Sequence, residues 1–396
     1  MEKKKYGAFS VISIILIAAC LRGPITGIGP LVTTLQGELG LSASVAGLLT
    51  TLPLATFAVV SFFTSAISRR LGAGKTMLVS LIVKIKGLII RSFTGTAGLF
   101  IGTVIVALGI GVNNVMLPAV IKALFPEKIG LLTGLYTTLM AGFASLSTGT
   151  SVPLTLAFGW NIALGRWGVL AVLAIIFWLP NVKITFDDGA IKAEAGAGAH
   201  KAKRRSVAAS PISWYITLFM GFQSMVFYFT VAWFSTILQS FGYTPATSGL
   251  LNMIMMLCGL PGSFIMPIIA GKTKHQSFWG ALIGFLFVLG TAGLMFAYTI
   301  PGLILTIVTY GFGTGGSIAF CMVLFGLHTH DAQDATSLSS LAQGVGYVLS
   351  AICPVMIGRI FDATGTWTVP FIVMIAISAA TLVTGWLSGL NKMVET

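Results

Sequence analysis

The sequence contains few charged residues: Asp, Glu, Lys and Arg make up 8% of its 396 residues, whereas they are about 25% of a typical soluble protein. It is also 56% hydrophobic, and its mean hydropathy is +0.96. A chain with so little charge cannot cover its apolar side chains with a polar surface. The composition therefore excludes a water-soluble globule and indicates an integral membrane protein.

The sequence also lacks the patterns of an enzyme or an ATP-driven pump. It has no phosphate-binding loop and no serine, cysteine or histidine arrangement typical of nucleophilic catalysis. The glycine-rich run Gly311-Phe-Gly313-Thr-Gly315-Gly316 fits a dinucleotide pattern, but it lies inside an apolar segment. The four cysteines lie in apolar segments at spacings that suit neither disulfides nor a metal site: Cys20, Cys258, Cys321 and Cys353. We expect no enzyme activity, no cofactor and no metal.

No Asp or Glu lies inside the long apolar segments, although four basic residues do: Arg22, Lys84, Lys86 and Arg166. A charged side chain at bilayer depth costs at least about 2.5 to 3.5 kcal/mol on insertion scales, so an unpaired one usually has a function. Because no carboxylate is available as a partner, we hypothesise that the partner is an anionic or electron-rich solute.

Runs of apolar residues long enough to cross a bilayer recur along the chain and predict twelve transmembrane helices. The predicted spans are 8–34, 43–67, 76–93, 98–124, 129–157, 161–180, 213–239, 246–270, 277–298, 302–328, 335–358 and 368–389. Most of the 23 Lys and Arg residues fall on one side of this arrangement. The positive-inside rule then predicts both termini in the cytoplasm of a bacterial cell. The net charge of +13 is interpreted as topology and attraction to anionic lipid, without a nucleic-acid partner.

The one long polar stretch divides the chain into two halves. We predict an N-terminal six-helix half at 1–181, a cytoplasmic linker at 182–212 and a C-terminal six-helix half at 213–396. The halves resemble each other at an offset of about 202 residues. For example, Ala107-Leu-Gly109-Ile-Gly111-Val corresponds to Thr309-Tyr-Gly311-Phe-Gly313-Thr. The predicted fold is all-α, with two parallel six-helix repeats and a solute site near the membrane midplane between them.

Several local motifs are similar to one transporter family. They are Leu21-Arg22 to Gly29-Pro30-Leu31, Gly47-Leu-Leu-Thr-Thr-Leu-Pro53, Ile90-Arg91-Ser92, Asn114-Val-Met-Leu-Pro-Ala-Val-Ile-Lys122, Ser210-Pro-Ile-Ser-Trp214, Ala342-Gln-Gly-Val-Gly-Tyr347 and Asp362-Ala-Thr-Gly-Thr-Trp367. With twelve spans, the chain resembles the major facilitator superfamily and, within it, the cyanate and nitroimidazole transporter family. The resemblance implies secondary transport by alternating access, with the first, fourth, seventh and tenth helices lining a cavity. One departure is Arg69, which stands where the superfamily usually has an acid, so an acid-based latch is in doubt.

The candidate solute-binding residues are polar or aromatic side chains on the helices expected near the cavity: Arg22, Thr26, Asn113, Asn114, Gln223, Phe227, Tyr228, Gln343 and Tyr347. Arg22 is the expected anchor, because a guanidinium group donates two parallel hydrogen bonds to a carboxylate or nitro group. Its alternative role is to bond backbone carbonyls near Gly23-Pro24. Only one of Asn113 and Asn114 is expected to face the cavity, since adjacent helical residues point about 100° apart.

The leading hypothesis is a monomeric secondary transporter for a small anionic or nitro-bearing, heterocyclic solute. Two alternatives remain: a broad-specificity drug exporter and a membrane sensor that binds solute without moving it. The direction of transport and its coupling stay open. We also expect Arg91 and Arg359 to reach the headgroups, His328 to lie on the surface, and Gly315 and Gly316 to leave space opposite the asparagines.

Overall fold

The computed structural model describes residues 8–41, 43–186 and 206–395, and this part of the chain is all-helical. The first half contains α1 (Ala8–Thr26), α2 (Val32–Leu39), α3 (Ala43–Leu71), α4 (Ala73–Phe93), α5 (Gly95–Leu124), α6 (Ile129–Gly165) and α7 (Trp167–Trp178). The second half contains α9 (Pro211–Ser240), α10 (Pro245–Leu257), α11 (Gly259–Lys272), α12 (Ser277–Met295), α13 (Ile300–Leu327), α14 (Ala332–Thr364) and α15 (Thr368–Ser388). Short 3₁₀ turns join some of them: η1 (Gly29–Leu31), η2 (Pro126–Lys128), η3 (Leu179–Asn181) and η4 (Val207–Ala209).

The helices account for the twelve predicted membrane crossings. By length and apolarity, 10 segments of the described chain qualify as crossings. One of these, Pro126–Asn181, has 56 residues and crosses twice, first as α6 up to Gly159 and then as the end of α6 together with α7. The remaining crossing is α4, whose 21 residues are long enough but include Lys75, Lys84, Lys86 and Arg91.

Glycine and proline decide where crossings bend or break. In α6 the backbone of Gly159 has φ 81°, a left-handed value that only glycine adopts easily, and the chain turns there into the next crossing. The eighth crossing is split at Cys258 into α10 and α11. Pro261 lies just inside α11 and has no N–H to offer the preceding turn, which explains the break. Pro24 stands near the end of α1, where the helix stops earlier than predicted.

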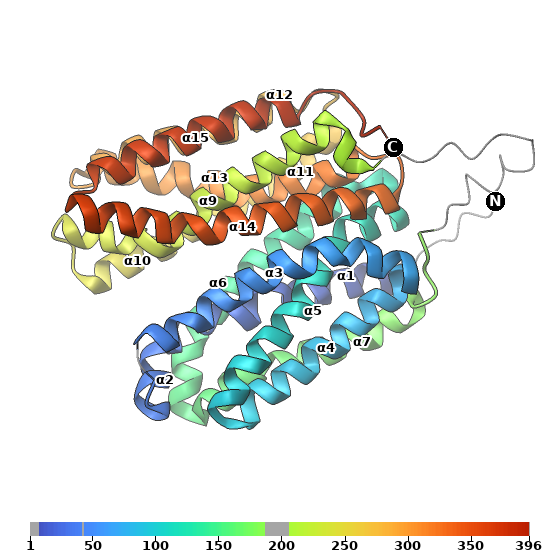
Figure 1. Ribbon diagram of the computed structural model, residues 1–396, viewed down its shortest axis with the longest axis horizontal. Helices are drawn as coiled ribbons and strands as arrows, with labels where there is room; N and C mark the ends of the chain where they lie inside the picture. The colour runs from blue at the N-terminus through green and yellow to red at the C-terminus, as the bar shows by residue number, and fades with distance from the viewer. Residues whose placement is uncertain (1–7, 42, 187–205, 396) are drawn as a thin grey trace, which may run out of the picture.

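The two sets of helices form two bundles that lie side by side (Figure 1). They meet mainly where α3 and α5 pack on α14 and where α6 packs on α11. This arrangement is the major facilitator fold with two parallel repeats. The boundaries 1–181, 182–212 and 213–396 stay a prediction, because most of the linker, 187–205, lies outside the described residues.

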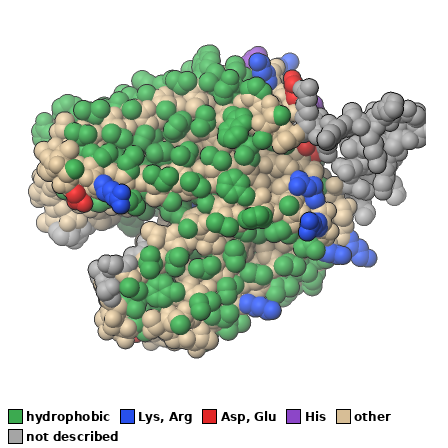
Figure 2. Space-filling view, in the orientation of Figure 1, with side chains coloured by type: hydrophobic (Ala, Val, Ile, Leu, Met, Phe, Trp, Pro, Cys, Tyr) green, Lys and Arg blue, Asp and Glu red, His purple; other side chains and the backbone are tan. Residues whose placement is uncertain are grey.

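The bundles touch at one end and separate at the other. The start of α1 and the segment after α15 lie at the same end of the molecule, on the right of Figure 1, and we call this the closed end. There Ser10 of α1 bonds Asn181 of η3, and the backbone of Val394 bonds that of His328. Figure 2 shows the molecule hollowed between the bundles at the opposite end, and we call this hollow the cleft. The protein is therefore open to one side only.

Candidate functional site

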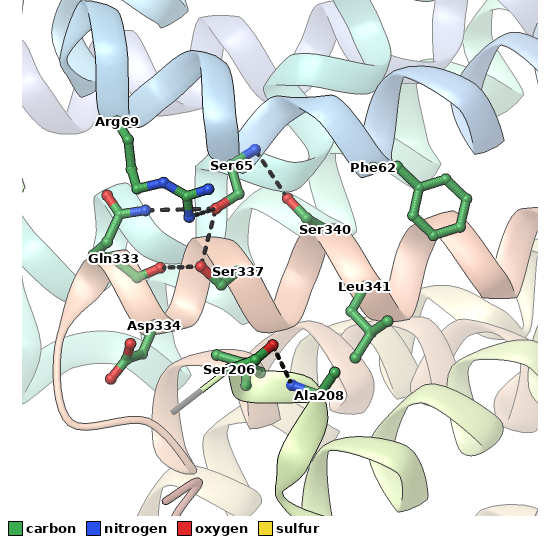
Figure 3. Close-up of a pocket in the computed structure, with 11 residues that line it drawn as sticks. Phe62, Ser65, Arg69, Ser206, Ala208, Gln333, Asp334, Ser337, Ser340 and Leu341 are labelled. Carbon is green, nitrogen blue, oxygen red and sulfur yellow. Dashed lines mark hydrogen bonds between the residues drawn. The ribbon is translucent and has the colours of Figure 1, made fainter. Parts of the chain in front are cut away.

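Serine hydroxyls join α3 to α14 at the closed end (Figure 3). The Ser65 hydroxyl lies 2.9 Å from that of Ser337, and the Ser65 backbone N–H donates to the Ser340 hydroxyl at 3.2 Å. Arg69 donates to the same Ser65 hydroxyl at 3.0 Å. A cavity of about 480 Å³ lies beside these bonds and is lined by Phe62, Ser65, Arg69, Ser206, Val207, Ala208, Gln333, Asp334, Ser337, Ser340 and Leu341. Hydroxyl contacts thus help to close this end at the point where the superfamily's acid is absent.

Two glycines of α6 let the bundles approach closely next to these contacts. A Cβ atom at Gly130 would lie 2.5 Å from the carbonyl oxygen of Pro267, and one at Gly134 would lie 2.7 Å from that of Phe264. Three residues farther along α6, the Thr137 hydroxyl donates to the Ser263 carbonyl at 3.0 Å. The packing of α6 on α11 therefore depends on the absence of side chains at these two positions.

Arg22 lies between the two halves, well along α1 from the closed end. Its guanidinium donates to the Tyr228 hydroxyl of α9 at 3.4 Å and lies 5.7 Å from the centre of the Phe227 ring. The Arg22 side chain remains partly exposed, and so do both aromatic residues. A guanidinium has five N–H donors, and Tyr228 takes only one. The group therefore keeps donors for an anion, held against an aromatic wall from the other half.

Thr26 and Tyr347 border Arg22 in different ways. The Thr26 hydroxyl donates to the carbonyls of Arg22 and Ala144, both at 3.2 Å, so it ties α1 to α6. Tyr347 of α14 is buried, packs on Phe57 with ring centres 5.3 Å apart, and interacts electrostatically with Arg22. Both residues shape the surroundings of Arg22, and direct contact with a solute stays a prediction.

The two asparagines of α5 are both buried but differ in their contacts. Asn113 is fully buried, and its Oδ1 accepts a hydrogen bond from Ser80 of α4 at 2.7 Å. Asn114 keeps a small exposed fraction of 6%, and its backbone carbonyl accepts from Gln343 of α14 at 3.1 Å. Asn114 is the better candidate for a solute contact, and Asn113 belongs to the interior of the first half.

Gln223 and Gln343 are both buried and already hydrogen-bonded within the protein. Gln223 accepts from the Ser317 hydroxyl at 2.8 Å and donates to that of Ser224 at 2.7 Å. Gln343 donates to the Ser339 hydroxyl at 2.8 Å as well as to Asn114. The Oε1 atom of Gln343 has no partner in the described chain. These amides fix helix contacts in the present conformation, and their role in binding stays a prediction.

Three expectations about other residues were wrong. Arg91 does not reach the headgroups, because it is fully buried and donates to the carbonyls of Pro24 at 2.6 Å and Leu164 at 2.9 Å. His328 is 3% exposed and lies under the segment after α15. Gly315 and Gly316 leave no space opposite the asparagines, since they pack against Gly259 and Met266 of α11. Arg359, by contrast, is exposed as expected.

The acidic residues of the described chain stand at helix ends or in connections, away from the middle of the crossings: Glu38, Glu127, Asp331, Asp334, Asp362 and Glu395. No cluster of His, Cys, Asp and Glu that could hold a metal is found among the described residues. In the described chain, no carboxylate therefore stands beside Arg22 in the middle of the crossings.

Two helix bundles around a cleft that is open at one end define the class of membrane transporters that work by alternating access. The Major Facilitator Superfamily model matches residues 14–351. A solved structure of the proton:xylose symporter XylE, bound to 6-bromo-6-deoxy-D-glucose, shares the fold with a TM-score of 0.74 at 13% identity, over 98% of each chain.

Relatives of similar length narrow the family. The uncharacterized transporter YycB of Bacillus subtilis is 38% identical over 95% of this chain and 92% of its own length. The 2-nitroimidazole transporter of Escherichia coli is 33% identical over 97% and 96%, and the cyanate transport protein CynX of Escherichia coli is 24% identical over 89% and 90%. The chain belongs to the major facilitator superfamily and, within it, to the cyanate and nitroimidazole transporter family. These relatives are named as transporters, in agreement with the expectation of a non-enzymatic membrane protein.

Proposed function

We propose that this protein carries a small anionic or nitro-bearing, heterocyclic solute across the bacterial cytoplasmic membrane, with Arg22 as the principal anchor. The observation that carries the proposal is the partly exposed guanidinium of Arg22 between the halves, which donates to the Tyr228 hydroxyl of the other half. A carboxylate or nitro group fits the planar donor pair of a guanidinium. The relative named as a 2-nitroimidazole transporter supports a solute of this kind.

The aromatic side of the site favours a flat solute. Phe227 and Tyr228 meet edge to face, with ring centres 5.0 Å apart, and the Arg22 guanidinium lies over the Phe227 ring. Such an arrangement offers an apolar surface for a ring beside a charged donor for its polar substituent. Asn114 is the polar group we add to the site on the side of α5, with Thr26 and Tyr347 in supporting positions.

Alternating access then requires the closed end to open. The Ser65–Ser337 and Ser65–Ser340 bonds would break, and the bundles would close over the present cleft. With both termini in the cytoplasm, as the distribution of Lys and Arg predicts, the present conformation faces outward. We propose that the monomer performs this cycle, with anionic lipids attracted to its basic cytoplasmic side.

The test is a thermal-stability screen of the purified protein with four probes: potassium cyanate, 2-nitroimidazole, sodium benzoate and the lipophilic cation tetraphenylphosphonium. A ligand that binds the folded state raises stability by RT ln(1 + [L]/Kd). We expect stabilisation by at least one anion or nitro compound. In Arg22→Gln the affinity should fall roughly 10- to 100-fold, because charge-assisted hydrogen bonds contribute about 1.5 to 3 kcal/mol. Arg359→Gln, which removes an exposed arginine, is the matched control.

A measurement of solute uptake distinguishes a transporter from a sensor. Proteoliposomes should take up the stabilising probe in its radiolabelled form, and Arg22→Gln should abolish uptake while the protein stays folded. Near-normal uptake by Arg22→Gln would remove the anchor role. Stabilisation by tetraphenylphosphonium alone, unchanged in the variant, would favour a drug exporter, whereas saturable binding without flux would favour a sensor.

A further inference from the structure

Lys84 is a fully buried lysine in the middle of a membrane-spanning helix. It is the twelfth residue of the 21-residue α4 and is 0% exposed, whereas Lys86, two residues on, is exposed. Its Nζ atom is buried and has no hydrogen-bond partner, and among the described residues it is the one lysine in that state. The proposed solute site does not use it, so its presence needs a separate explanation.

In the described chain no acceptor bonds the ammonium group of Lys84, although polar side chains stand one helical turn away. A Cβ atom at Gly109 of α5 would lie 2.9 Å from the Lys84 Cβ, so the two helices touch where the lysine begins. One turn away, Ser80 bonds Asn113, and the Nδ2 of Asn113 is also buried without a partner. Asn113 adjoins Asn114, whose side chain keeps some exposure. Ser80 and Asn113 therefore place polar groups one turn along α4 from Lys84.

Arg91 is a second buried basic residue on the same helix, and it offers a comparison with Lys84. It lies two turns after Lys84 on the same buried face of α4, and two backbone carbonyls accept hydrogen bonds from it. An arginine keeps its charge in proteins, whereas a buried lysine readily releases its proton. A cation without water or an acceptor is costly in a low-dielectric interior. The environment of Lys84 is therefore suited to a neutral amine that becomes charged only in another state of the protein.

The titratable groups around Lys84 are few. From α1, the Cys20 thiol acts on it electrostatically. The other helices packed on α4 are α3, α5, α6 and α7, and in the described chain none of them contributes a titratable group that acts on it. On α4 itself, Arg91 is held by its carbonyls and Lys86 faces outward. Nothing in the described chain competes with Lys84 for the role of a proton carrier in the first half.

We propose that Lys84 is the proton-binding residue that couples solute movement to proton movement in this transporter. The inference rests on the proposed function, because it takes an anionic solute at Arg22 as the partner of the proton. Proton coupling is often the task of a carboxylate inside a crossing. The described membrane crossings have no carboxylate in mid-helix, and the proposal assigns this task to a lysine.

The coupling follows from charge. Lys84 lies on the side of α1 that carries Cys20, whereas Arg22, two residues on, points about 200° away around that helix, so the two cations act on each other across α1 and not in direct contact. While the site is empty, the positive Arg22 disfavours a second cation. An anion bound at Arg22 cancels that charge, and the amine of Lys84 then takes one proton from water on the side to which the cleft is open. After the bundles switch, the anion leaves and the ammonium group returns one proton to water on the other side. One anion and one proton therefore cross together, as symport.

The first experiment needs no solute. Lysine labelled with ¹³C at Cε is incorporated into the purified protein, and the Lys84 resonance is assigned by its loss in Lys84→Met, or in Lys84→Gln if the methionine variant does not fold. As the pH is raised, we expect this resonance to change from the charged to the neutral position before the resonances of the exposed lysines do, whose ordinary pKa is near 10.4. A resonance that stays in the charged position up to about pH 10 overturns the proposal, whatever the solute is.

The second experiment counts protons with sodium benzoate as the probe. Calorimetry in two buffers of different ionisation enthalpy gives the protons taken up per benzoate bound. We expect up to one in the wild type, none in Lys84→Met, and the wild-type value in the matched control Lys86→Met. Where one proton is taken up per anion, the apparent affinity falls about tenfold per pH unit on the alkaline side. Binding of benzoate without any proton uptake in the wild type overturns the proposal.

Proteoliposomes complete the test and separate it from the proposed function. Lys84→Met should exchange labelled benzoate across the membrane at equilibrium but fail to accumulate it in response to a pH gradient. Lys84→Arg, with a fixed charge, should also lose accumulation. Gradient-driven accumulation by either variant overturns the proposal. If benzoate, cyanate and 2-nitroimidazole all fail to bind, the proposed function fails, while the solute-free ¹³C titration still decides the state of Lys84.

Discussion

Lys122 of α5 donates to the backbone carbonyl of Gly326 at the end of α13, with 2.6 Å between Nζ and O, and also to the carbonyl of Thr329. The last carbonyls of a helix lack partners within the helix and carry partial negative charge, so a cation is well placed there. Here the cation comes from the other half of the molecule. The bond therefore stabilises the closed end and exists only while that end is closed.

Replacing Lys122 with Met should shift the protein toward the state in which the closed end is open. Hydrogen bonds to a charged group contribute about 1.5 to 3 kcal/mol, which corresponds to a change of roughly 10- to 100-fold in the ratio of the two states. Spin labels on Lys128→Cys and Lys272→Cys, on opposite halves, report the opening as a longer electron–electron distance. Lys75→Met, an exposed lysine on the same side, is the control. An unchanged distance distribution in Lys122→Met would contradict this role.

A side chain at Gly134 should have the same effect for a steric reason. A Cβ atom there would lie 2.7 Å from the Phe264 carbonyl oxygen, closer than real Cβ contacts, so α6 and α11 must separate. Gly134→Val is expected to lengthen the same spin-label distance and to slow uptake. Gly142→Val on the same helix should change neither, because no atom lies within 4 Å of a Cβ at that position. Equal behaviour of the two variants would show that the close approach is not decisive.

Arg91 is expected to be important for folding. Its guanidinium satisfies the carbonyls of Pro24 and Leu164 and thereby holds the end of α1 against the junction of α6 and α7. Arg91→Met would leave both carbonyls buried without a donor, at about 1 to 3 kcal/mol each. We expect a marked fall in Tm, measured by thermal unfolding in detergent, and a much smaller fall for the exposed Arg359→Met. Comparable losses for the two variants would show that Arg91 contributes no more than a surface arginine.

His328 should make the protein less stable in acid. Burial lowers the pKa of His328, the nearby Lys122 lowers it further, and the 2.7 Å hydrogen bond to the Lys392 carbonyl offsets part of this shift. Below about pH 6.5 the unfolded chain therefore binds a proton that the folded protein does not. Stability should then fall as the pH drops from about 6.5 toward the lower pKa of the folded state.

The measurement for His328 is the loss of Tm between about pH 7.5 and pH 5.5. The loss should be smaller in His328→Asn, which keeps a donor for the Lys392 carbonyl but does not titrate. His330→Asn, at an exposed neighbouring position, should follow the wild type. If His328→Asn loses as much Tm as the wild type, the acid sensitivity has another origin.

Local patterns predicted much of the fold correctly. The spans agree with the helices because apolar length and glycine or proline breaks are properties of short segments. Lys84 and Lys86 lie on different faces of α4, one buried and the other exposed, as the rotation of about 100° per residue requires. The sequence named Phe227 and Tyr228 as candidate site residues, but it did not predict that they lie against Arg22.

Contacts between distant segments could not be predicted in this way. Arg91 donates to carbonyls that lie 67 and 73 positions away in the sequence. Because the sequence does not reveal these partners, the position of Arg91 near the end of a crossing led us to expect contact with the lipid headgroups. Ser65 and Ser337 belong to different halves, and neither residue type signals an interface. The sequence held one clue to the serine contacts. Arg69 stands where the superfamily usually has an acid, so some other contact had to close that end.

The sequence by itself determined that this is a membrane protein of twelve crossings in two related halves, because the length of apolar segments and an internal repeat can be recognised in the sequence alone. It also determined that basic groups, without acids, stand inside the crossings. Only the tertiary structure decided which basic group lies between the halves, which donates to buried carbonyls and which has no hydrogen-bond partner in the described chain. It also decided which end is closed. The physical reason is that these properties depend on how helices far apart in sequence pack, and on close contacts through glycines and hydroxyls that carry no periodic signal.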